Sequence, residues 1–117
     1  MSDPVHGKVQ RLRDTGDVAA DLRDLARSEL ALVMQPRIIR VRRLVISEVD
    51  RFPELGLAFY EQGPGRIINA LAETFERLTA RGLLYCDDPL VAATHFNWLI
   101  MSQPLNRAMF LHDAAVP

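Results

Sequence analysis

The sequence predicts an all-α fold in which five to six helices form one domain with orthogonal, bundle-like packing. The chain has 117 residues, of which 49% are hydrophobic and 25% are charged, a composition that supports one hydrophobic core. Proline and glycine recur at intervals of roughly one helix length, and the apolar residues between them recur with the period of an α-helix. The sequence shows neither the sustained alternation typical of strands nor an internal repeat.

The first well-marked helix begins at Asp17, whose carboxylate is suited to accept hydrogen bonds from free backbone N–H groups. It ends before Pro36, which interrupts an existing helix but suits the first turn of the next one. Its apolar side is predicted to consist of Val18, Leu22, Leu25, Leu30 and Val33. Residues 5–13 have a short helical pattern, and we expect residues 1–16 to be a residual linker helix or a disordered start.

The second helix runs from Pro36 to Phe52 and carries an apolar stripe that we expect to be buried. That stripe consists of Ile38, Val41, Val45, Val49 and Phe52, with Leu44 and Ile46 widening it. Four arginines also lie between residues 37 and 43, in a chain whose total charge is not basic. The arginines favour a solvated face paired with Glu48, Asp50 or a neighbouring helix, and the alternative is a docking surface for another domain.

The Phe52-Pro53-Glu54 segment predicts a sharp corner followed by a short helix over residues 54–61. The apolar residues of this helix, Leu55, Leu57, Phe59 and Tyr60, are expected to be buried. The Gly63-Pro64-Gly65 cluster predicts a turn before the next helix, because glycine and proline both weaken helices. The next amphipathic helix covers residues 66–81, and Gly82 suits its C-terminal cap.

Two acidic residues directly before Pro89 mark the start of another helix, over residues 88–101. In this position Asp87 and Asp88 favour a helix cap over a catalytic carboxylate pair. The helix is apolar on almost every side, so it has to be covered on both faces. A domain of this size has few elements to do so, and a second subunit is the economical explanation. Pro104 is expected to break or kink the chain, with residues 105–111 forming a last short helix.

The composition limits the classes of function. The chain has 14 basic and 15 acidic side chains and a net charge of −1, which disfavours direct nucleic-acid binding by these residues. Cys86 is the only cysteine, so neither an intramolecular disulfide nor a cysteine-based metal site is predicted. The N-terminus lacks a signal-peptide pattern, and no apolar run is long enough to span a bilayer. We therefore expect no membrane association and a cytoplasmic location.

No catalytic set, metal site or cofactor site is predicted, so the chain is expected not to be an enzyme. The histidines His6, His95 and His112 do not lie at the spacings of metal ligands. A small helical enzyme in which His95 acts with a carboxylate is the less favoured alternative. A histidine at this position of a helix is more typical of a core or an interface.

Several segments resemble a known family. The segment RRLVISEVDRFPEL at residues 42–55, followed by AFYE at residues 58–61 and by Gly63-Pro64, resembles the C-terminal domain of TetR/AcrR-type transcriptional regulators, in the AefR-like branch. The segments ARGLL at residues 80–84 and DDP at residues 87–89, followed by a long apolar helix, come in the same order. The resemblance extends from about residue 17 to residue 111.

The resemblance implies that residues 17–117 form an effector-binding and dimerisation domain without a cofactor. It implies a homodimer joined by a four-helix bundle, in which each copy contributes residues 66–81 and 88–101. The interface residues would be Ile68, Leu71, Phe75, Ala92, Phe96 and Leu99. The other partner would be a small apolar or amphipathic organic effector, bound by Leu30, Met34, Phe59, Tyr60, His95 and Trp98.

Members of this family bind operator DNA through an N-terminal three-helix domain with a helix-turn-helix. Residues 1–16 show no such pattern, so we expect that domain to be absent from this chain and operator binding to depend on it. The resemblance thus implies the effector-sensing and dimerisation domain of a TetR-type regulator, a repressor. The alternative is a stand-alone all-α ligand-binding or dimerisation module without DNA binding.

Overall fold

The computed structural model describes residues 15–111. In that part of the chain the regular structure consists of five α-helices and one π-helical turn, and it contains no strand. The helices are α2 (Val18–Val33), α3 (Pro36–Glu48), α4 (Pro53–Tyr60), α5 (Arg66–Ala80) and α6 (Pro89–Phe110), with the π turn at Glu61–Gly65. The predicted all-α class is confirmed. The helical pattern at residues 5–13 and the histidines His6 and His112 lie outside the described residues.

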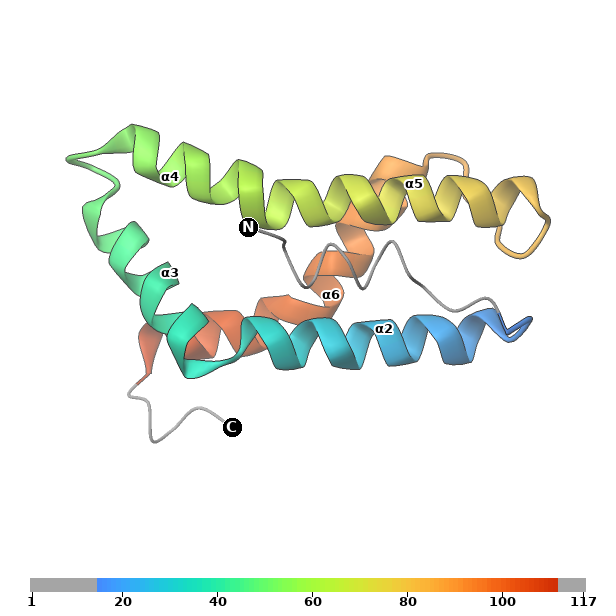
Figure 1. The fold of residues 1–117 in the computed structure, drawn as a ribbon, viewed down its shortest axis with the longest axis horizontal. Coiled ribbons are helices and arrows are strands. Elements are labelled where there is room, and N and C mark those ends of the chain that lie inside the picture. The colour runs from blue at the N-terminus through green and yellow to red at the C-terminus, as the bar shows by residue number, and fades with distance from the viewer. Residues whose placement is uncertain (1–14, 112–117) are drawn as a thin grey trace.

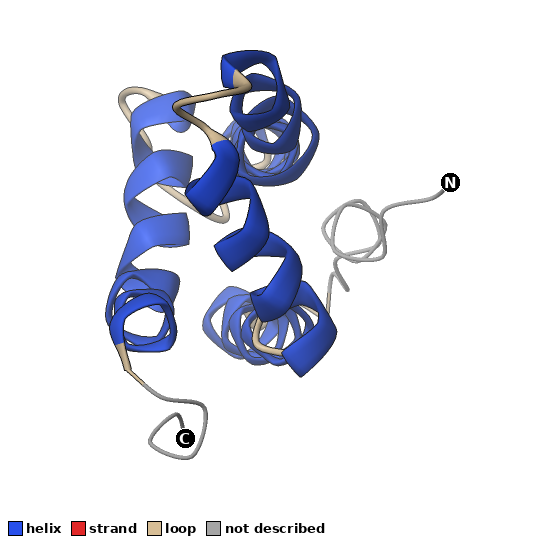
Figure 2. Ribbon diagram, turned by 90° about the vertical axis from the view of Figure 1, so that its left-hand side faces the viewer, coloured by secondary structure: helices blue, strands red, loops and turns tan. Residues whose placement is uncertain are grey.

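The helices form an open frame that is crossed by α6. In Figure 1, α4 and α5 follow one another along the top and α2 runs along the bottom. The shorter α3 joins these two rods at one end, and α6 crosses obliquely between them (Figures 1 and 2). The main core contains Leu25, Val33, Ile39, Ile67, Ile68, Ala70, Leu71, Phe75, Ala93, Met101, Leu105 and Ala108. The core therefore joins α2, α3, α5 and α6, which lie far apart in the sequence.

The start of α2 agrees with the sequence. The carboxylate of Asp17 accepts a hydrogen bond from the backbone N–H of Ala20 at 3.1 Å, which confirms the predicted N-cap. Thr15 reinforces this end, because its backbone N–H and its hydroxyl both donate to the carboxylate of Asp21, at 3.0 and 2.9 Å. These bonds give the buried Asp21 carboxylate the hydrogen bonds that its burial requires.

The predicted burial of the second and third helices is only partly correct. Ile39 and Val45 are the buried residues of α3, whereas Val41, Leu44, Ile46, Val49 and Phe52 are exposed large hydrophobics. In α4, Leu55, Leu57 and Tyr60 are exposed as well, so the prediction that they are buried is wrong for the single chain. Both helices lie at one end of the frame and pack against the other helices through one side only (Figure 1). Periodicity revealed the helices but could not reveal how much of each is covered.

The corner after α3 is held by a close approach between the two helices that it joins. A Cβ atom at Gly56 would lie 2.6 Å from a methyl carbon of Val49, well inside van der Waals contact. Glycine at this position therefore lets α4 pack directly on the last turn before the corner. Pro53 opens α4 at its first turn, as the sequence predicts.

The predicted turn at Gly63-Pro64-Gly65 is not a break. The backbone stays helical from Tyr60 to Arg66, and Glu61–Gly65 forms a π turn that links α4 directly to α5. The proline ring at Pro64 is incompatible with regular α-helical bonding, and the wider turn accommodates it. A Cβ atom at Gly65 would lie only 3.1 Å from the carbonyl oxygen of Tyr60, so glycine permits this close approach of the backbone. Turns of this type often occur at functional sites.

The end of α5 agrees with the prediction for Gly82. That residue has a φ of 76°, the left-handed conformation that favours glycine. Its N–H donates to the carbonyl of Thr79 at 3.0 Å, and the N–H of Leu83 donates to the carbonyl of Leu78 at 2.9 Å. This pair of bonds is the Schellman arrangement, which ends a helix by satisfying its last carbonyl groups.

The start of α6 also agrees with the sequence, and it gives a testable prediction. The carboxylate of Asp88 accepts hydrogen bonds from the N–H groups of Leu90 and Val91, at 3.1 and 3.2 Å. We expect Asp88→Ala to lower the free energy of unfolding by about 1 kcal/mol, because two N–H groups of the first turn lose their acceptor. Chemical denaturation followed by circular dichroism measures this change.

Asp87→Ala is the matched control for this substitution. The exposed Asp87 carboxylate accepts from the hydroxyl of Tyr85, at 2.7 Å, whereas the N–H groups of the first turn donate to Asp88. Its replacement should therefore change the free energy of unfolding by less than about 0.5 kcal/mol. Equal losses for the two alanine variants would contradict the assignment of Asp88 as the cap.

The last helix is longer than predicted. The sequence suggested that the chain breaks or kinks at Pro104, with a separate helix over residues 105–111, but α6 continues through Pro104 to Phe110. Proline removes one backbone hydrogen bond and bends the helix, and Figures 1 and 2 show that α6 changes direction along its length. Met101, Leu105 and Ala108 are buried on both sides of the proline, so packing holds the two halves together.

A side chain of α3 fixes the end of α6. The guanidinium of Arg43 donates to the carbonyl of Ala108 from Nε at 2.9 Å and also from Nη2. It donates to the carbonyl of Leu111 at 3.2 Å. A cation at these carbonyls satisfies groups that the helix leaves unpaired and complements its dipole. Arg43 is therefore a structural link between α3 and α6 rather than part of a solvated face.

Candidate functional site

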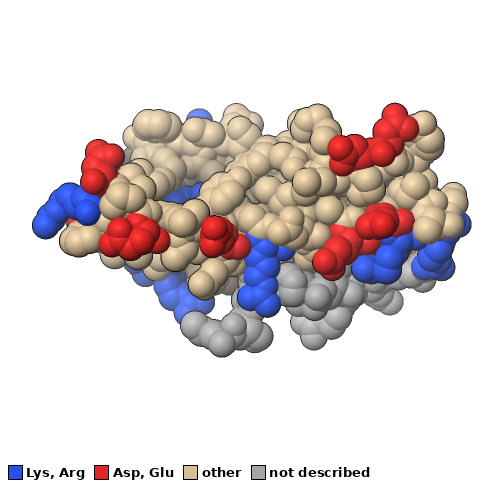
Figure 3. Space-filling model, turned by 90° about the horizontal axis from the view of Figure 1, so that it is seen from above, with Lys and Arg blue, Asp and Glu red and all other residues tan. Residues whose placement is uncertain are grey.

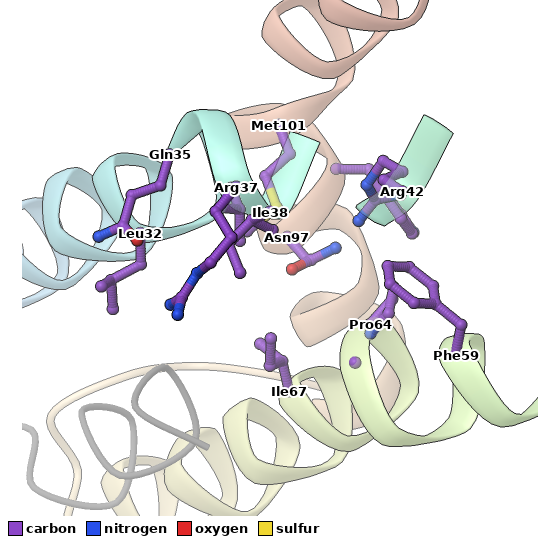
Figure 4. A pocket seen from close by; sticks show the side chains of 13 residues that line it. Leu32, Gln35, Arg37, Ile38, Arg42, Phe59, Pro64, Ile67, Asn97 and Met101 are labelled. Atoms are coloured by element: carbon purple, nitrogen blue, oxygen red, sulfur yellow. The ribbon is translucent and has the colours of Figure 1, made fainter. Parts of the chain in front are cut away.

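A cavity of about 200 Å³ lies where α2, α3, α4, the π turn, α5 and α6 meet. The close-up in Figure 4 shows lining side chains that converge on it from these segments. The lining residues are Leu32, Val33, Gln35, Arg37, Ile38, Arg42, Phe59, Gly63, Pro64, Ile67, Asn97, Trp98 and Met101. The π turn contributes Gly63 and Pro64, so the unusual backbone between α4 and α5 forms part of the cavity wall.

Most of the cavity wall is apolar. Phe59, Ile67 and Met101 are clear in Figure 4, and Trp98 adds a second aromatic ring to the lining. The volume exceeds the ~150 Å³ of an engineered apolar protein cavity that binds benzene. A wall of aromatic, aliphatic and thioether groups with few polar atoms is typical of sites for small organic molecules.

Arg42 brings a positive charge to this apolar wall. Its guanidinium carbon lies 5.3 Å from the centre of the Phe59 ring, which is within the range of a cation–π contact. Its Nε is buried and donates to no hydrogen-bond acceptor within residues 15–111. Burial lowers the pKa of the Arg42 guanidinium, because an apolar environment disfavours the charged form. Arginine nevertheless stays protonated in proteins, so the cavity wall carries a cation.

Asn97 is the second polar group of the wall. Its side chain is only 1% exposed, and neither its oxygen nor its nitrogen has a hydrogen-bond partner among the described residues. A buried amide without partners costs about 1–3 kcal/mol, and native proteins rarely leave such a group unsatisfied. Figure 4 shows the amide directed toward the side of the cavity where Arg42 and Phe59 lie. Two unpartnered donors thus meet at one end of an apolar cavity.

The charged residues of the lining all have the same sign. Arg37 and Arg42 line the cavity, and the thirteen lining residues include neither aspartate nor glutamate. Arg37 is exposed, so solvent screens its charge, whereas Arg42 is half-buried. In a chain with a net charge of −1, this cavity is a local region of positive charge.

The structure brings two of the six predicted ligand-binding residues to the cavity. Phe59 and Trp98 line it. Leu30 and Met34 are partly buried and pack against the main core instead. Tyr60 is exposed at the end of α4, and His95 is exposed on α6. The lining therefore does not include Leu30, Met34, Tyr60 or His95.

The six predicted interface residues divide into two groups. Ile68, Leu71 and Phe75 are buried within the single chain, where they form the α5 side of the core. Ala92 and Phe96 are partly buried, and the Phe96 ring meets that of Phe75 edge to face, with centres 5.4 Å apart. Leu99 is 86% exposed. Among these six, Leu99 alone presents its apolar side chain to the surface of the single chain.

The outer face of α6 carries a further apolar residue besides Leu99. Val91 is also exposed, and His95 lies between it and Leu99. Leu90 is exposed in the first turn, nine residues from Leu99 and therefore on the opposite side of the helix. The inner face of α6 consists of Ala93, Asn97, Met101, Leu105 and Ala108, all of which are buried. The chain thus covers one side of the apolar helix and leaves the other side open.

Outside the cavity, the described part of the chain has a surface of mixed charge. The face seen in Figure 3 is mostly uncharged, with acidic and basic side chains intermixed at its margins and no continuous basic area. Within residues 15–111, no cluster of three potential metal ligands occurs, and none of the helices is long and apolar enough to cross a membrane. Cys86 is a free, partly buried thiol that packs against the core.

The sequence did not reveal the roles of Arg42 and Asn97, the two lining residues that have buried polar atoms without a partner among residues 15–111. The four arginines of α3 have different roles: Arg37 and Arg42 line the cavity, Arg43 bonds the end of α6, and Arg40 is exposed. Arg43 pairs with a neighbouring helix, as one form of the prediction allowed, whereas the predicted solvated face is wrong for the half-buried Arg42. One signal was available for Asn97, which is a polar residue inside the apolar run HFNWLIM. A polar residue on the buried side of such a helix usually has a partner or a ligand.

Two comparisons relate the chain to known proteins, and a third comparison, with curated proteins, finds no match. Residues 20–117 match the family described as the AefR-like transcriptional repressor, C-terminal domain. The crystal structure of a protein from Mesorhizobium loti MAFF303099, assigned to the TetR family of transcriptional regulators, superposes with a TM-score of 0.86 and 36% sequence identity. The match covers 91% of this chain and 52% of the other, so the chain spans about half the length of that regulator. The chain belongs to the TetR family of transcriptional regulators, as an AefR-like C-terminal domain.

Proposed function

We propose that residues 17–117 are the effector-binding and dimerisation domain of a TetR-type repressor, and that the effector binds in the cavity between α3 and α6. One observation carries the proposal: the apolar cavity of about 200 Å³ contains the unpartnered polar groups of Arg42 and Asn97. A cavity with this composition matches the general form of small-molecule sites, in which a few polar groups orient a mostly apolar ligand. The domain acts by binding and not by catalysis.

The position of the cavity suggests how binding would act on the whole domain. Its lining comes from α2, α3, α4, α5 and α6, so a bound molecule contacts every helix of the described chain. A ligand that fits one arrangement of these helices better than another shifts the population toward that arrangement. Because α6 carries both Asn97 in the cavity and the exposed Leu99, a shift of this helix would reach the outer face that we assign to the dimer.

The DNA-binding step belongs in this proposal to a separate N-terminal domain of a regulator that works on DNA in the cytoplasm. The residues described here have a mixed surface charge on the face in Figure 3 and a chain charge of −1, so they are poorly suited to hold phosphates. A gel-shift experiment with this chain alone is expected to show no operator binding at physiological salt.

A cavity-filling substitution tests the effector site. Ile38 lines the cavity from α3, and Ile38→Phe should occupy part of the volume that a ligand needs. In a thermal-shift screen of small organic molecules, hits should stabilise the wild type by about 2.7 kcal/mol at a hundredfold excess over their dissociation constant. The same hits should bind Ile38→Phe at least about tenfold more weakly.

Val41→Phe is the matched control, because it adds a similar volume to the exposed side of the same helix. It should leave the binding of every hit unchanged. A screen in which hits bind both variants equally well would contradict the assignment of the cavity as the effector site.

A further inference from the structure

We propose that the effector is a small monocarboxylic acid, whose carboxylate binds between Arg42 and Asn97 while its apolar body lies against Phe59, Ile67 and Met101. This inference rests on the proposed effector site and deepens it by assigning the chemical class of the ligand. The donors, the charge and the volume of the cavity each favour such a ligand.

The donors at this end of the cavity are those that recognise a carboxylate. The buried Nε of Arg42 donates to no acceptor within the described part of the chain, and a guanidinium offers its N–H groups in a planar fork that matches two carboxylate oxygens. The contact with the Phe59 ring holds the guanidinium plane in place without using these donors. Arg42 is thus positioned and still able to donate.

Asn97 completes the polar end. Its amide is almost fully buried, lacks a partner among residues 15–111, and is directed toward the Arg42 side of the cavity in Figure 4. The amide N–H₂ group supplies further donors for the same oxygens. A ligand without an acceptor would leave the N–H groups of both residues unsatisfied, whereas a carboxylate would accept from both. The Asn97 oxygen, which also lacks a partner among residues 15–111, needs a donor that the carboxylate does not supply.

The charge of the lining favours an anion with a single negative charge. Arg42 is the half-buried cation, Arg37 is exposed to solvent, and the lining contains no acidic residue that would repel an anion or neutralise Arg42. One carboxylate balances one buried guanidinium. A phosphate monoester brings about −1.5 to −2 charges at neutral pH, so part of its charge would stay buried without a partner.

The volume and the wall limit the rest of the molecule. A cavity of about 200 Å³ exceeds the ~150 Å³ of an apolar cavity that holds benzene, so a single ring or a short alkyl chain fits beside the carboxylate. Phe59, Ile67, Met101 and Trp98 provide an apolar surround for such a body. Phenylacetate and hexanoate represent the two shapes.

The experiment compares each acid with its neutral amide of nearly the same shape. Dissociation constants of the intact 117-residue chain for phenylacetate, phenylacetamide, hexanoate and hexanamide are measured by isothermal titration calorimetry at neutral pH. We expect at least one acid to bind about tenfold or more tightly than its amide, because a hydrogen bond to a charged group is worth more than one to a neutral group.

Two substitutions test the residues separately. Arg42→Gln should weaken the acid about tenfold or more and change the binding of the amide by less than about threefold, since only the charge-dependent bonds are lost. Asn97→Asp keeps the size of the side chain but places a carboxylate beside Arg42, so it should also weaken the acid about tenfold or more. Arg40→Gln, on the exposed side of α3, should leave both dissociation constants unchanged. Circular dichroism melting verifies that each variant folds.

The outcomes separate this inference from the proposal on which it rests. If neutral amides bind as tightly as acids and Ile38→Phe blocks both, the cavity is the effector site but the ligand class is wrong. If acids are preferred but Arg42→Gln and Asn97→Asp do not weaken them, the assigned residues are wrong. If none of the four probes binds while other hits of the screen are blocked by Ile38→Phe, the ligand class is wrong and the cavity site stands. If both Arg42→Gln and Asn97→Asp selectively weaken the binding of the acid, the ligand class and the cavity site are both supported.

Discussion

Replacing Leu71 with alanine is expected to lower the free energy of unfolding by about 2–5 kcal/mol, a large part of the ~5–15 kcal/mol that typically stabilises a domain. Leu71 is fully buried in the core between α5 and its neighbours, so the shorter side chain leaves a cavity that the surrounding helices fill only in part. Chemical denaturation of wild type and variant under identical conditions measures the difference.

The concentration dependence of the same experiment separates a core residue from an interface residue. Leu71 belongs to the core of the single chain, so the loss caused by alanine should be the same at low and at high protein concentration. Leu57→Ala is the matched control, because Leu57 is 59% exposed on α4 and its truncation should cost less than about 0.5 kcal/mol. If Leu71→Ala lowered the free energy of unfolding only at concentrations at which the protein dimerises, Leu71 would be an interface residue.

Leu99→Glu is expected to convert a dimer of this chain to a monomer while leaving the fold intact. Leu99 is 86% exposed, so a charge there disturbs no internal packing of the single chain. In a dimer joined through the outer face of α6, the same charge would be buried without a partner, which costs several kcal/mol. We expect the dissociation constant of the dimer to rise about a hundredfold or more. Sedimentation equilibrium of the two proteins measures it.

Leu57→Glu provides the control for this prediction, since it places the same charge at an exposed leucine of α4. That variant should dimerise like the wild type. A wild-type chain that stays monomeric at high concentration would remove the proposed dimer. A Leu99→Glu variant that still dimerises would move the interface away from this face of α6.

Local features of the fold were predictable from the sequence because they depend on neighbouring residues. Asp17 and Asp88 cap their helices as expected, and Gly82 ends α5 in the left-handed conformation. Such features need only a side-chain acceptor or a missing Cβ atom within a few residues of the helix end. The break predicted at Gly63-Pro64-Gly65 did not occur, because a π turn accommodates the proline. At Pro104, where a break or a kink was predicted, α6 bends but continues.

The candidate site was less predictable, because it depends on which helices meet. The aromatic residues Phe59 and Trp98 were expected to contact a ligand, and both line the cavity. Leu30 and Met34 have the same apolar character but face the core instead. A period of 3.6 residues gives the faces of a helix and does not say which face turns to a cavity, to the core or to solvent.

By itself, the sequence determined the all-α class, most helix boundaries and the family, since capping, periodicity and motif order are written along the chain. The tertiary structure alone decided the roles of Arg42, Asn97 and Leu99. It brings the first two, which are 55 residues apart in the sequence, to the wall of one cavity, and it turns the third outward. The physical reason is that burial and electrostatic environment are set by neighbours in space, and these neighbours are fixed only when the helices pack.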